Sequence, residues 1–190
     1  MLLIISTVFA SGVMIQSDHK IDSNCNLSSK NTISNWTVMY YMCCDSNMMS
    51  LGKPLLENLT EIGSTDDFNL IALYDGVPSN DSKIIYFSED NKRVNLNNVV
   101  GWPSEVDYSN PVTLEEFVKD IISYYPAENY AVFFYGSAGT GWMKFCVCDT
   151  HGTYNDLIQK GKTGFSTPRL GEVFKEITES TEEKIDIIYT

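Results

Sequence analysis

Histidine and basic side chains are scarce in this sequence. The 190 residues include 2 His and 13 Lys and Arg, against 25 Asp and Glu, which gives a formal net charge of −12. A chain with this excess of negative charge is repelled by phosphate groups, and no cluster of Lys and Arg offsets the repulsion locally. Nucleic acids and anionic membrane surfaces are therefore excluded as partners.

Long hydrophobic runs are also missing beyond the first residues. The N-terminus is apolar from Leu2 to Ala10 and continues with small residues, which is typical of a secretory signal peptide over residues 1–17. An uncleaved membrane anchor is the alternative, but the run is too short to span a bilayer comfortably. The first basic residue is Lys20, so the usual positive flank is missing. We expect a secreted or extracytoplasmic protein, whose membrane contact is limited to this export segment, with a polar linker over residues 18–35.

The cysteines lack the C-x-x-C spacing of common metal and redox sites. The chain has five of them, at positions 25, 43, 44, 146 and 148. In an oxidising compartment four could pair and leave one over, and the sequence does not reveal the pairing. A zinc site built from Cys43-Cys44 and Cys146-x-Cys148 is conceivable, but small buried hydrophobic residues are the better interpretation. We predict no metal site from them.

Apolar strands and amphipathic segments alternate along the rest of the chain. Continuous β-branched and aromatic runs predict buried strands at residues 36–42, 68–75, 130–135, 144–149 and 184–190. A weaker alternating segment at 83–90 either extends the sheet or forms a hairpin with 92–97. This order is typical of one α/β domain, here residues 36–190, with a mostly parallel sheet covered by helices on both faces.

Three helices are predicted between these strands. Gly52 and Pro54 place the start of the first helix at about that point, and Gly63 ends it. Thr113, with Glu116 three residues later, is typical of a capping box for the second. Thr167 is expected to be the N-cap of the third, with proline directly after it.

Chemistry-bearing residues are expected at one edge of this sheet. Sites in parallel α/β folds lie outside the carboxyl ends of the strands. Asp45 and Asp75 follow or end two predicted strands, and a glycine-rich turn follows a third. We therefore expect Asp45, Asp75 and the turn to lie close together.

The turn occurs in the segment "AVFFYGSAGTGW", residues 131–142. A nucleotide-binding turn must open a helix whose N-terminus faces the phosphate. Here Trp142 and a strand-like segment follow instead, which disfavours nucleotide binding. A purely structural turn remains the alternative to a binding role.

Several blocks resemble the clostripain family of cysteine endopeptidases, which have a caspase-like fold. The blocks are "WTVMYYM", "LLENLTEIGSTDDFNLIALYD", "SNPVTLEEFVKDIISYYPAENYAVFFYGSAGTGW" and "KIDIIYT", in the family's order from Trp36 to Thr190. The resemblance implies hydrolysis of peptide bonds in a peptide or protein substrate, with Arg or Lys before the cleaved bond. It implies no cofactor, although some relatives bind calcium, for which Asp75 is a candidate.

The resemblance also assigns roles around the turn. The family's D-H-G-[GS]-G-W motif carries the catalytic histidine and a glycine whose N–H binds the oxyanion. Gly139 matches that glycine, but Ala138 occupies the histidine position and Ser137 the preceding aspartate. The family's nucleophile lies in a D-A-C segment that we expect shortly after Thr190, so the domain is expected to be incomplete at its C-terminus.

Loss of the histidine predicts an inactive chain. An imidazole keeps a cysteine thiolate available at neutral pH and protonates the leaving amine, and alanine does neither. His151, Cys43 and Cys44 are poor replacements by position, and a solvated loop histidine and buried cysteines are the better interpretations. The alternative function is a pseudopeptidase that binds peptides or proteins without cleaving them.

A polar loop at residues 150–166 contains Lys160 and Lys162, each next to glycine. In the family, light and heavy chains arise by cleavage after a basic residue in this part of the sequence. An exposed Lys-Gly loop suits such processing, and a loop that is merely polar is the alternative.

Overall fold

The computed structural model describes residues 33–45, 48–136, 146 and 166–190. The expected signal peptide and nearly all of the expected linker lie outside these ranges. So do most residues of the glycine-rich turn and of the lysine loop. In the described part of the chain, no helix is long and apolar enough to cross a membrane.

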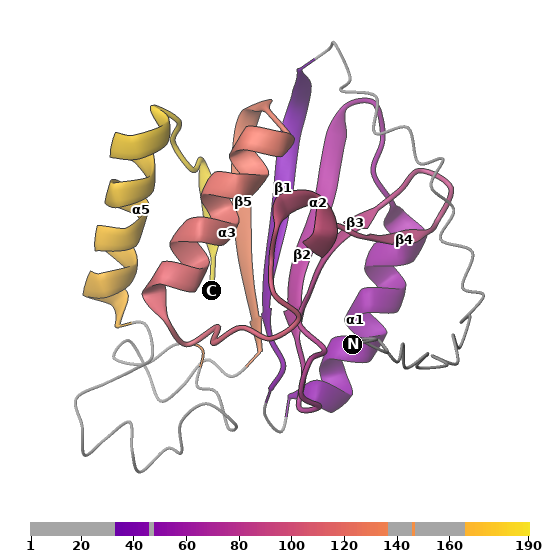
Figure 1. Cartoon of the computed structure of the whole chain (residues 1–190). Helices are drawn as coiled ribbons and strands as arrows, with labels where there is room; N and C mark the ends of the chain where they lie inside the picture. Colours follow the sequence, from indigo (N-terminus) through magenta and orange to yellow (C-terminus); the bar gives the residue numbers. More distant parts are fainter. Residues whose placement is uncertain (1–32, 46–47, 137–145, 147–165) are drawn as a thin grey trace, which may run out of the picture. The chain divides into compact units, whose positions relative to one another are not determined.

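Six described strands form one mixed sheet (Figure 1). They are β1 (Ser34–Cys43), β2 (Phe68–Asp75), β3 (Lys83–Phe87), β4 (Arg93–Asn95), β5 (Ala127–Gly136) and β6 (Ile187–Tyr189). Their order is β4-β3-β2-β1-β5-β6. The pairs β1–β2, β1–β5 and β5–β6 are parallel, whereas β2–β3 and β3–β4 are antiparallel. The predicted mostly parallel sheet is confirmed, and the weaker segment forms a hairpin.

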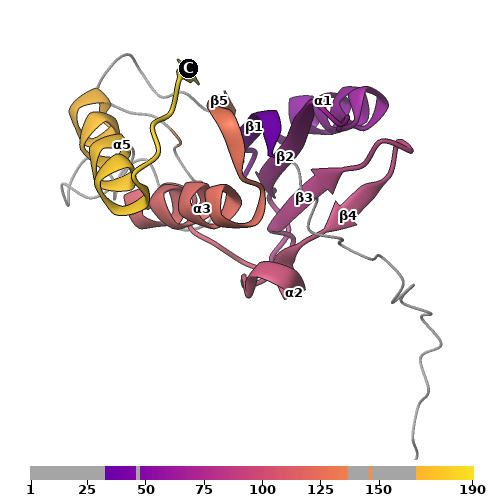
Figure 2. The same cartoon turned by 90° about the horizontal axis from the view of Figure 1, so that it is seen from above.

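Helices cover both faces of the sheet, as predicted (Figure 2). One face carries α1 (Met49–Ile62), and the other carries α3 (Pro111–Tyr124) and α5 (Thr167–Thr181). A short helix, α2 (Asn97–Val100), precedes α3 and was not predicted. Each long helix buries an apolar stripe against the sheet, which is what amphipathic spacing requires.

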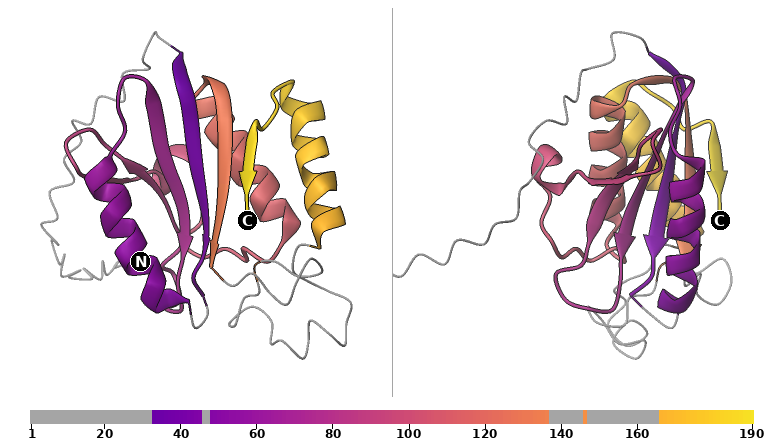
Figure 3. Two further views of the ribbon diagram at one scale, coloured as in Figure 1. Left: turned by 180° about the vertical axis from the view of Figure 1, so that it is seen from behind. Right: turned by 90° about the vertical axis from the view of Figure 1, so that its right-hand side faces the viewer.

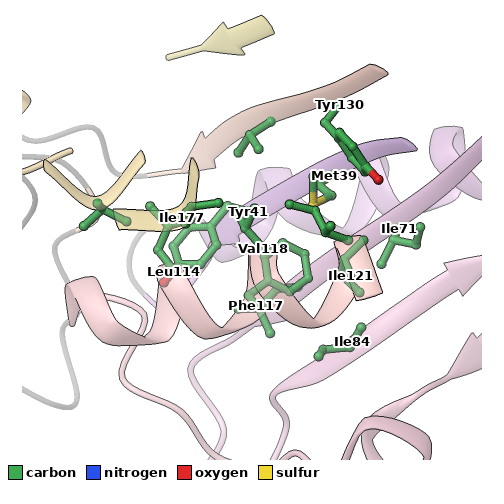
Figure 4. Packing of buried hydrophobic residues seen from close by; sticks show 14 of the residues in the cluster. Met39, Tyr41, Ile71, Ile84, Leu114, Phe117, Val118, Ile121, Tyr130 and Ile177 are labelled. Carbon is green, nitrogen blue, oxygen red and sulfur yellow. The ribbon is translucent and has the colours of Figure 1, made fainter. Parts of the chain in front are cut away.

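The larger hydrophobic core lies between the sheet and the α3–α5 face. Met39, Ile71 and Tyr130 contribute from the strands, and Phe117 and Ile177 from the helices (Figure 4). The predicted inward residues of α5 all lie in it: Leu170, Val173, Phe174 and Ile177. A smaller core under α1 contains Leu56, Leu59 and the opposite side chains of β1 and β2. Because β1 and β2 are buried on both faces, they appear in the sequence as continuous apolar runs.

The predicted helix starts are wrong by a few residues. Asn110, not Thr113, caps α3 and accepts a hydrogen bond from Val112 N, because Pro111 provides a preformed first helical residue. Ser166, not Thr167, caps α5 by accepting from Arg169 N. Helix α1 begins before Gly52, at Met49, and accommodates Pro54 inside it. Only one intrahelical donor is lost there, and the buried apolar stripe offsets that loss.

Two strand predictions also need correction. The segment forms a strand, as predicted, and this strand, β6, pairs with β5 at the edge of the described sheet (Figure 3). Its side chains Ile187, Ile188 and Tyr189 are exposed rather than buried. The reason is position, since β6 is the last strand of the described sheet and β5 is its only described neighbour. In the predicted strand at 144–149, only Cys146 is described. It has a φ of 56°, which is left-handed and not a strand conformation.

Candidate functional site

The carboxyl ends of three parallel strands meet at one edge of the sheet. Cys43 at the end of β1 is the register partner of Asp75 in β2 and of Gly136 in β5. Cys44 N also donates a hydrogen bond to Asp75 O at 3.0 Å. The glycine-rich turn continues directly from Gly136. Its Ser137, Ala138 and Gly139 lie outside the described residues, so the structure fixes where the turn begins.

Gly136 allows the turn to leave the sheet close to β1. Its φ is +127°, a conformation that side chains rarely adopt. A Cβ at this position would lie 2.1 Å from the carbonyl oxygen of Cys43. Both the backbone angle and the space therefore require glycine here.

Asp75 is a fully buried carboxylic acid at this edge. The Ser82 hydroxyl donates to its Oδ1, and among the described residues no hydrogen bond reaches Oδ2. Burial raises the pKa of Asp75 to about 7, and nearby Glu105 and Asp45 add to the rise while the Ser82 hydrogen bond opposes it. Near neutral pH the protonated and ionised forms of this side chain are therefore both populated.

Asp45 lies at the same edge, just beyond the end of β1, and is fully buried. Its backbone carbonyl accepts a hydrogen bond from the Tyr108 hydroxyl at 3.0 Å. Its negative charge adds to the rise in the pKa of Asp75. The structure thus places Asp75 and Gly136 on either side of Cys43, with Asp45 two residues beyond Cys43, and the role of these residues in a site stays a prediction.

A loop that the sequence pattern does not predict packs against Asp75. Gly76 N donates to Asp81 Oδ1 at 3.0 Å, and Val106 N donates to the Ser82 hydroxyl at 3.0 Å. Burial raises the pKa of Asp81 as well. Aspartate and serine after a strand-end glycine are a weak signal of this arrangement, because such residues are also common in ordinary loops.

A surface pocket of about 500 Å³ lies beside this loop, between α2 and the start of α3. Its acidic lining residues are Glu105, Asp107, Glu116 and Asp120. The Trp102 indole donates to Asp120 at 2.5 Å, so part of this lining is held by a hydrogen bond. The surface of the pocket is therefore rich in carboxylate side chains.

The neighbouring cysteines Cys43 and Cys44 face opposite sides of the sheet. Cys43 packs in the core under α3 and α5, and Cys44 packs in the core under α1. Burial raises the pKa of Cys43 well above its ordinary value and that of Cys44 to about 12. Neither thiol is suited to act as a nucleophile at neutral pH.

The described cysteines and acids do not assemble a metal site. Across residues 33–45, 48–136, 146 and 166–190, no group of three or more His, Cys, Asp or Glu side chains is placed to hold a metal ion. Cys43 and Cys44 lie in cores on opposite faces of the sheet, so the described residues do not bring these two thiols together. Cys148, His151, Lys160 and Lys162 lie outside the described residues.

Comparisons with known proteins agree with this architecture. The model of the clostripain family matches residues 40–189. The fold is similar to a secreted C11 cysteine protease from Bacteroides thetaiotaomicron in complex with an irreversible peptide inhibitor, with a TM-score of 0.55 and 20% identity over 82% of this chain. It is also similar to an inactive zymogen C11 protease from Parabacteroides distasonis, with a TM-score of 0.58 and 16% identity over 83% of this chain. No curated protein sequence matches the chain.

At these identities the two structures establish the fold alone, and they confirm the expected caspase-like architecture. The chain spans 41% of the length of each of them. The family follows instead from the sequence model, which extends from the middle of β1 to the end of β6. The chain belongs to the clostripain family.

Proposed function

We propose that this chain supplies the scaffold and the oxyanion-binding turn of a clostripain-type cysteine endopeptidase, and that it does not hydrolyse peptides by itself. The observation that carries the proposal is the register of β1, β2 and β5. It brings Cys43, Asp75 and Gly136 side by side, immediately before the turn that resembles the family motif. In parallel α/β sheets, sites are built at this edge.

The proposed inactivity rests on residue 138. In the motif that the turn resembles, this position holds the catalytic base, and here it is alanine. Gly139 N–H can still stabilise an oxyanion, which is a separate contribution to catalysis. Oxyanion stabilisation without a base and a thiolate leaves only a small residual rate.

The nucleophile and the substrate preference are part of the same proposal. We propose that a D-A-C segment follows Thr190 in the source protein and provides the cysteine. Asp45 and Asp75 are fully buried and are not placed to contact a substrate, so the preference for a basic residue rests on the resemblance to the family, whose acidic specificity residue is expected after Thr190. Cleavage after Arg or Lys is therefore the proposed specificity of the complete protein.

The test restores the base. In the source polypeptide that includes the D-A-C segment, Ala138→His is expected to give thiol-dependent hydrolysis of Arg and Lys amides. Ala138→Gln is the matched control, because glutamine has a similar size but cannot act as a base, and it is expected to stay inactive. A silent Ala138→His variant that folds normally and carries the cysteine would contradict the proposal.

A second candidate function is favoured by Ala138 itself. If alanine is native at this position, the chain suits a pseudopeptidase that binds peptides or another protein. This function predicts that the coding sequence after Thr190 lacks the D-A-C segment. It also predicts that the chain binds an Arg- or Lys-containing peptide without cleaving it, which calorimetry together with mass spectrometry of the peptide would show.

Export is proposed on the basis of the N-terminal segment. Residues 2–10 are apolar, and one structural neighbour is described as secreted. Expression with and without residues 1–17, followed by fractionation and N-terminal sequencing, tests this. We expect cleavage near residue 17. We also expect extracytoplasmic recovery only of the protein that was expressed with residues 1–17.

A further inference from the structure

Three buried cysteines surround the end of β1, and two of them are in contact. Cys43 and Cys146 belong to the same core, and Cys44 lies in the core on the opposite face. The thiols are free in the structure, and the side chains of Cys43 and Cys146 are hydrogen-bonded to each other. Of the adjacent residues Cys43 and Cys44, only Cys43 is therefore placed to react with Cys146.

Cys43 interacts with Gly136 and with Cys146, the described residues before and after the glycine-rich turn. Its backbone is in register with Gly136, which precedes residues 137–145. Its side chain contacts Cys146, which follows them. Cys146 is buried, at 3% exposed, and has the left-handed φ of 56°, which is uncommon for a residue other than glycine.

We propose that Cys43 and Cys146 form a disulfide bond, which joins Cys146 covalently to the last residue of β1. Gly136, on the other side of the glycine-rich turn in the sequence, is already joined to the same residue by strand pairing. The proposal concerns this bond alone and does not rest on peptide hydrolysis.

The reaction is a thiol–disulfide exchange with a small disulfide oxidant of the glutathione class. One cysteine thiolate attacks the oxidant and releases one small thiol, leaving a mixed disulfide on the protein. The second cysteine then attacks the protein sulfur and releases the other small thiol. Two electrons pass from the cysteine pair to the oxidant, and the two thiol protons end on the released small thiols.

Burial determines when the bond forms. It raises the pKa of Cys43 well above the ordinary thiol value, so thiolate is scarce in the folded chain. Oxidation is therefore expected during folding, before the core closes around Cys43. Once formed, the buried bond is shielded from reductants for the same reason.

The test uses the full chain with three cysteines removed. The variant C25S/C44S/C148S keeps only Cys43 and Cys146, whereas the matched control C25S/C43S/C148S keeps Cys44 and Cys146. Each is refolded in a mixture of reduced and oxidised glutathione, and free thiols are counted after removal of the glutathione. The expected result is almost no free thiol in the first variant and two per chain in the control.

Peptide mapping of the wild-type chain gives an answer that requires no variant to fold. After alkylation without reduction, a linked pair of peptides containing Cys43 and Cys146 is expected, with fragmentation assigning the bond to Cys43 rather than Cys44. Full alkylation of Cys43 and Cys146 would overturn the proposal. A bond from Cys146 to any other cysteine would overturn it as well.

Thermal unfolding gives an independent measure of the bond. A cross-link between residues roughly one hundred positions apart restricts the unfolded chain strongly, so reduction is expected to lower Tm by on the order of 10 °C. C146S is expected to show the same Tm with and without reductant. Because the buried bond is shielded in the native chain, the reduced sample is prepared by reduction in denaturant and refolding with reductant. An unchanged wild-type Tm in that sample would contradict the bond.

Discussion

The two ends of the same parallel strands differ in how they bury polar groups. At the amino ends the buried polar side chains are neutral and hydrogen-bonded: Thr37 donates to Tyr125 O at 2.8 Å, Asn69 donates to Thr37, and Ser64 donates to Phe87 O at 2.6 Å. At the carboxyl ends the buried groups are ionisable, and Asp75 has a raised pKa. Neutral, satisfied groups cost little to bury, whereas carboxylates cost much more. The amino ends are therefore organised for stability, and the carboxyl ends retain groups suited to chemistry.

Gly136→Ala is expected to have the largest effect on this comparison, because it disturbs the carboxyl ends directly. The new Cβ would overlap the Cys43 carbonyl, and the φ of +127° would be strained. A loss of about 4 kcal/mol or more in the free energy of unfolding is expected, measured by urea denaturation.

The matched control is Gly171→Ala in α5. A Cβ at Gly171 has nothing within 4 Å, and alanine is a better helix former. This variant is expected to gain about 0.5–1 kcal/mol. A loss of under 1 kcal/mol for Gly136→Ala would show that the strand ends are not as tightly packed as the structure has them.

Asp75→Asn tests whether the buried acid at the carboxyl ends makes the stability of the chain depend on pH. With the Asp75 pKa raised to about 7, the folded state keeps a proton that the unfolded state releases at its lower, ordinary pKa. The stability contribution of the neutral acid is therefore complete at low pH and is lost as the pH rises through about 7. Between pH 4 and pH 8, the wild type is expected to lose on the order of 3 kcal/mol relative to Asp75→Asn.

The control for this pH dependence is a carboxylate at the opposite, amino end of β2. Asp67→Asn changes an exposed acid next to the amino end of β2 and is expected to leave the wild-type pH dependence in place. Denaturant titrations at several pH values measure all three proteins. Parallel curves for the wild type and Asp75→Asn would show that Asp75 has an ordinary pKa.

Asn69→Ala tests the amino ends. It removes the donor to Thr37 from a buried site, and we expect a loss of about 1–3 kcal/mol that does not change with pH. Exposed Asn35→Ala, whose amide bonds Asp67 at 3.3 Å, is the control and is expected to cost under 1 kcal/mol. Equal losses in the free energy of unfolding for the two variants would show that burial of the Asn69 amide does not add to its contribution.

Ser166→Ala is expected to have the smallest effect. It removes the N-cap of α5, which begins at the end of the molecule where the parallel strands finish (Figure 1). A loss of about 1 kcal/mol is expected. Thr167→Ala is expected to cost only a few tenths of that loss. A larger loss for Thr167→Ala than for Ser166→Ala would show that Thr167 is the N-cap, as the sequence predicted.

The fold was predictable where local pattern decides the structure. Strands β1 and β2 are buried on both faces and therefore appear as continuous apolar runs, and α5 buries the expected stripe. The α3 cap was available in the sequence, since asparagine before Pro111 is a better signal than Thr113. The exposure of β6 was not predictable from the sequence, because it depends on which elements lie beside the strand.

The candidate site was predictable only in part. Strand ends place Asp45 and Asp75 at one edge without any knowledge of tertiary contacts. The contacts of Ser82 with Asp75 and of Cys146 with Cys43 join residues from separate segments, and nothing in the local pattern specifies them. Raised pKa values at Asp75 and Cys43 follow from burial, which also depends on the complete fold.

The central position of β1 has a consequence for how the chain folds. β1 pairs with β2 after one helix, but its other neighbour, β5, begins roughly ninety residues after the start of β1. Local pairs form quickly, whereas pairs distant in sequence wait for the closure of a long loop. During synthesis, β1, α1, β2 and the β3–β4 hairpin can associate first, with one side of β1 unpaired. β5 then pairs with the open side of β1, and α5 and β6 follow, so the edge that carries the glycine turn is assembled only after the half of the sheet formed by β1 to β4.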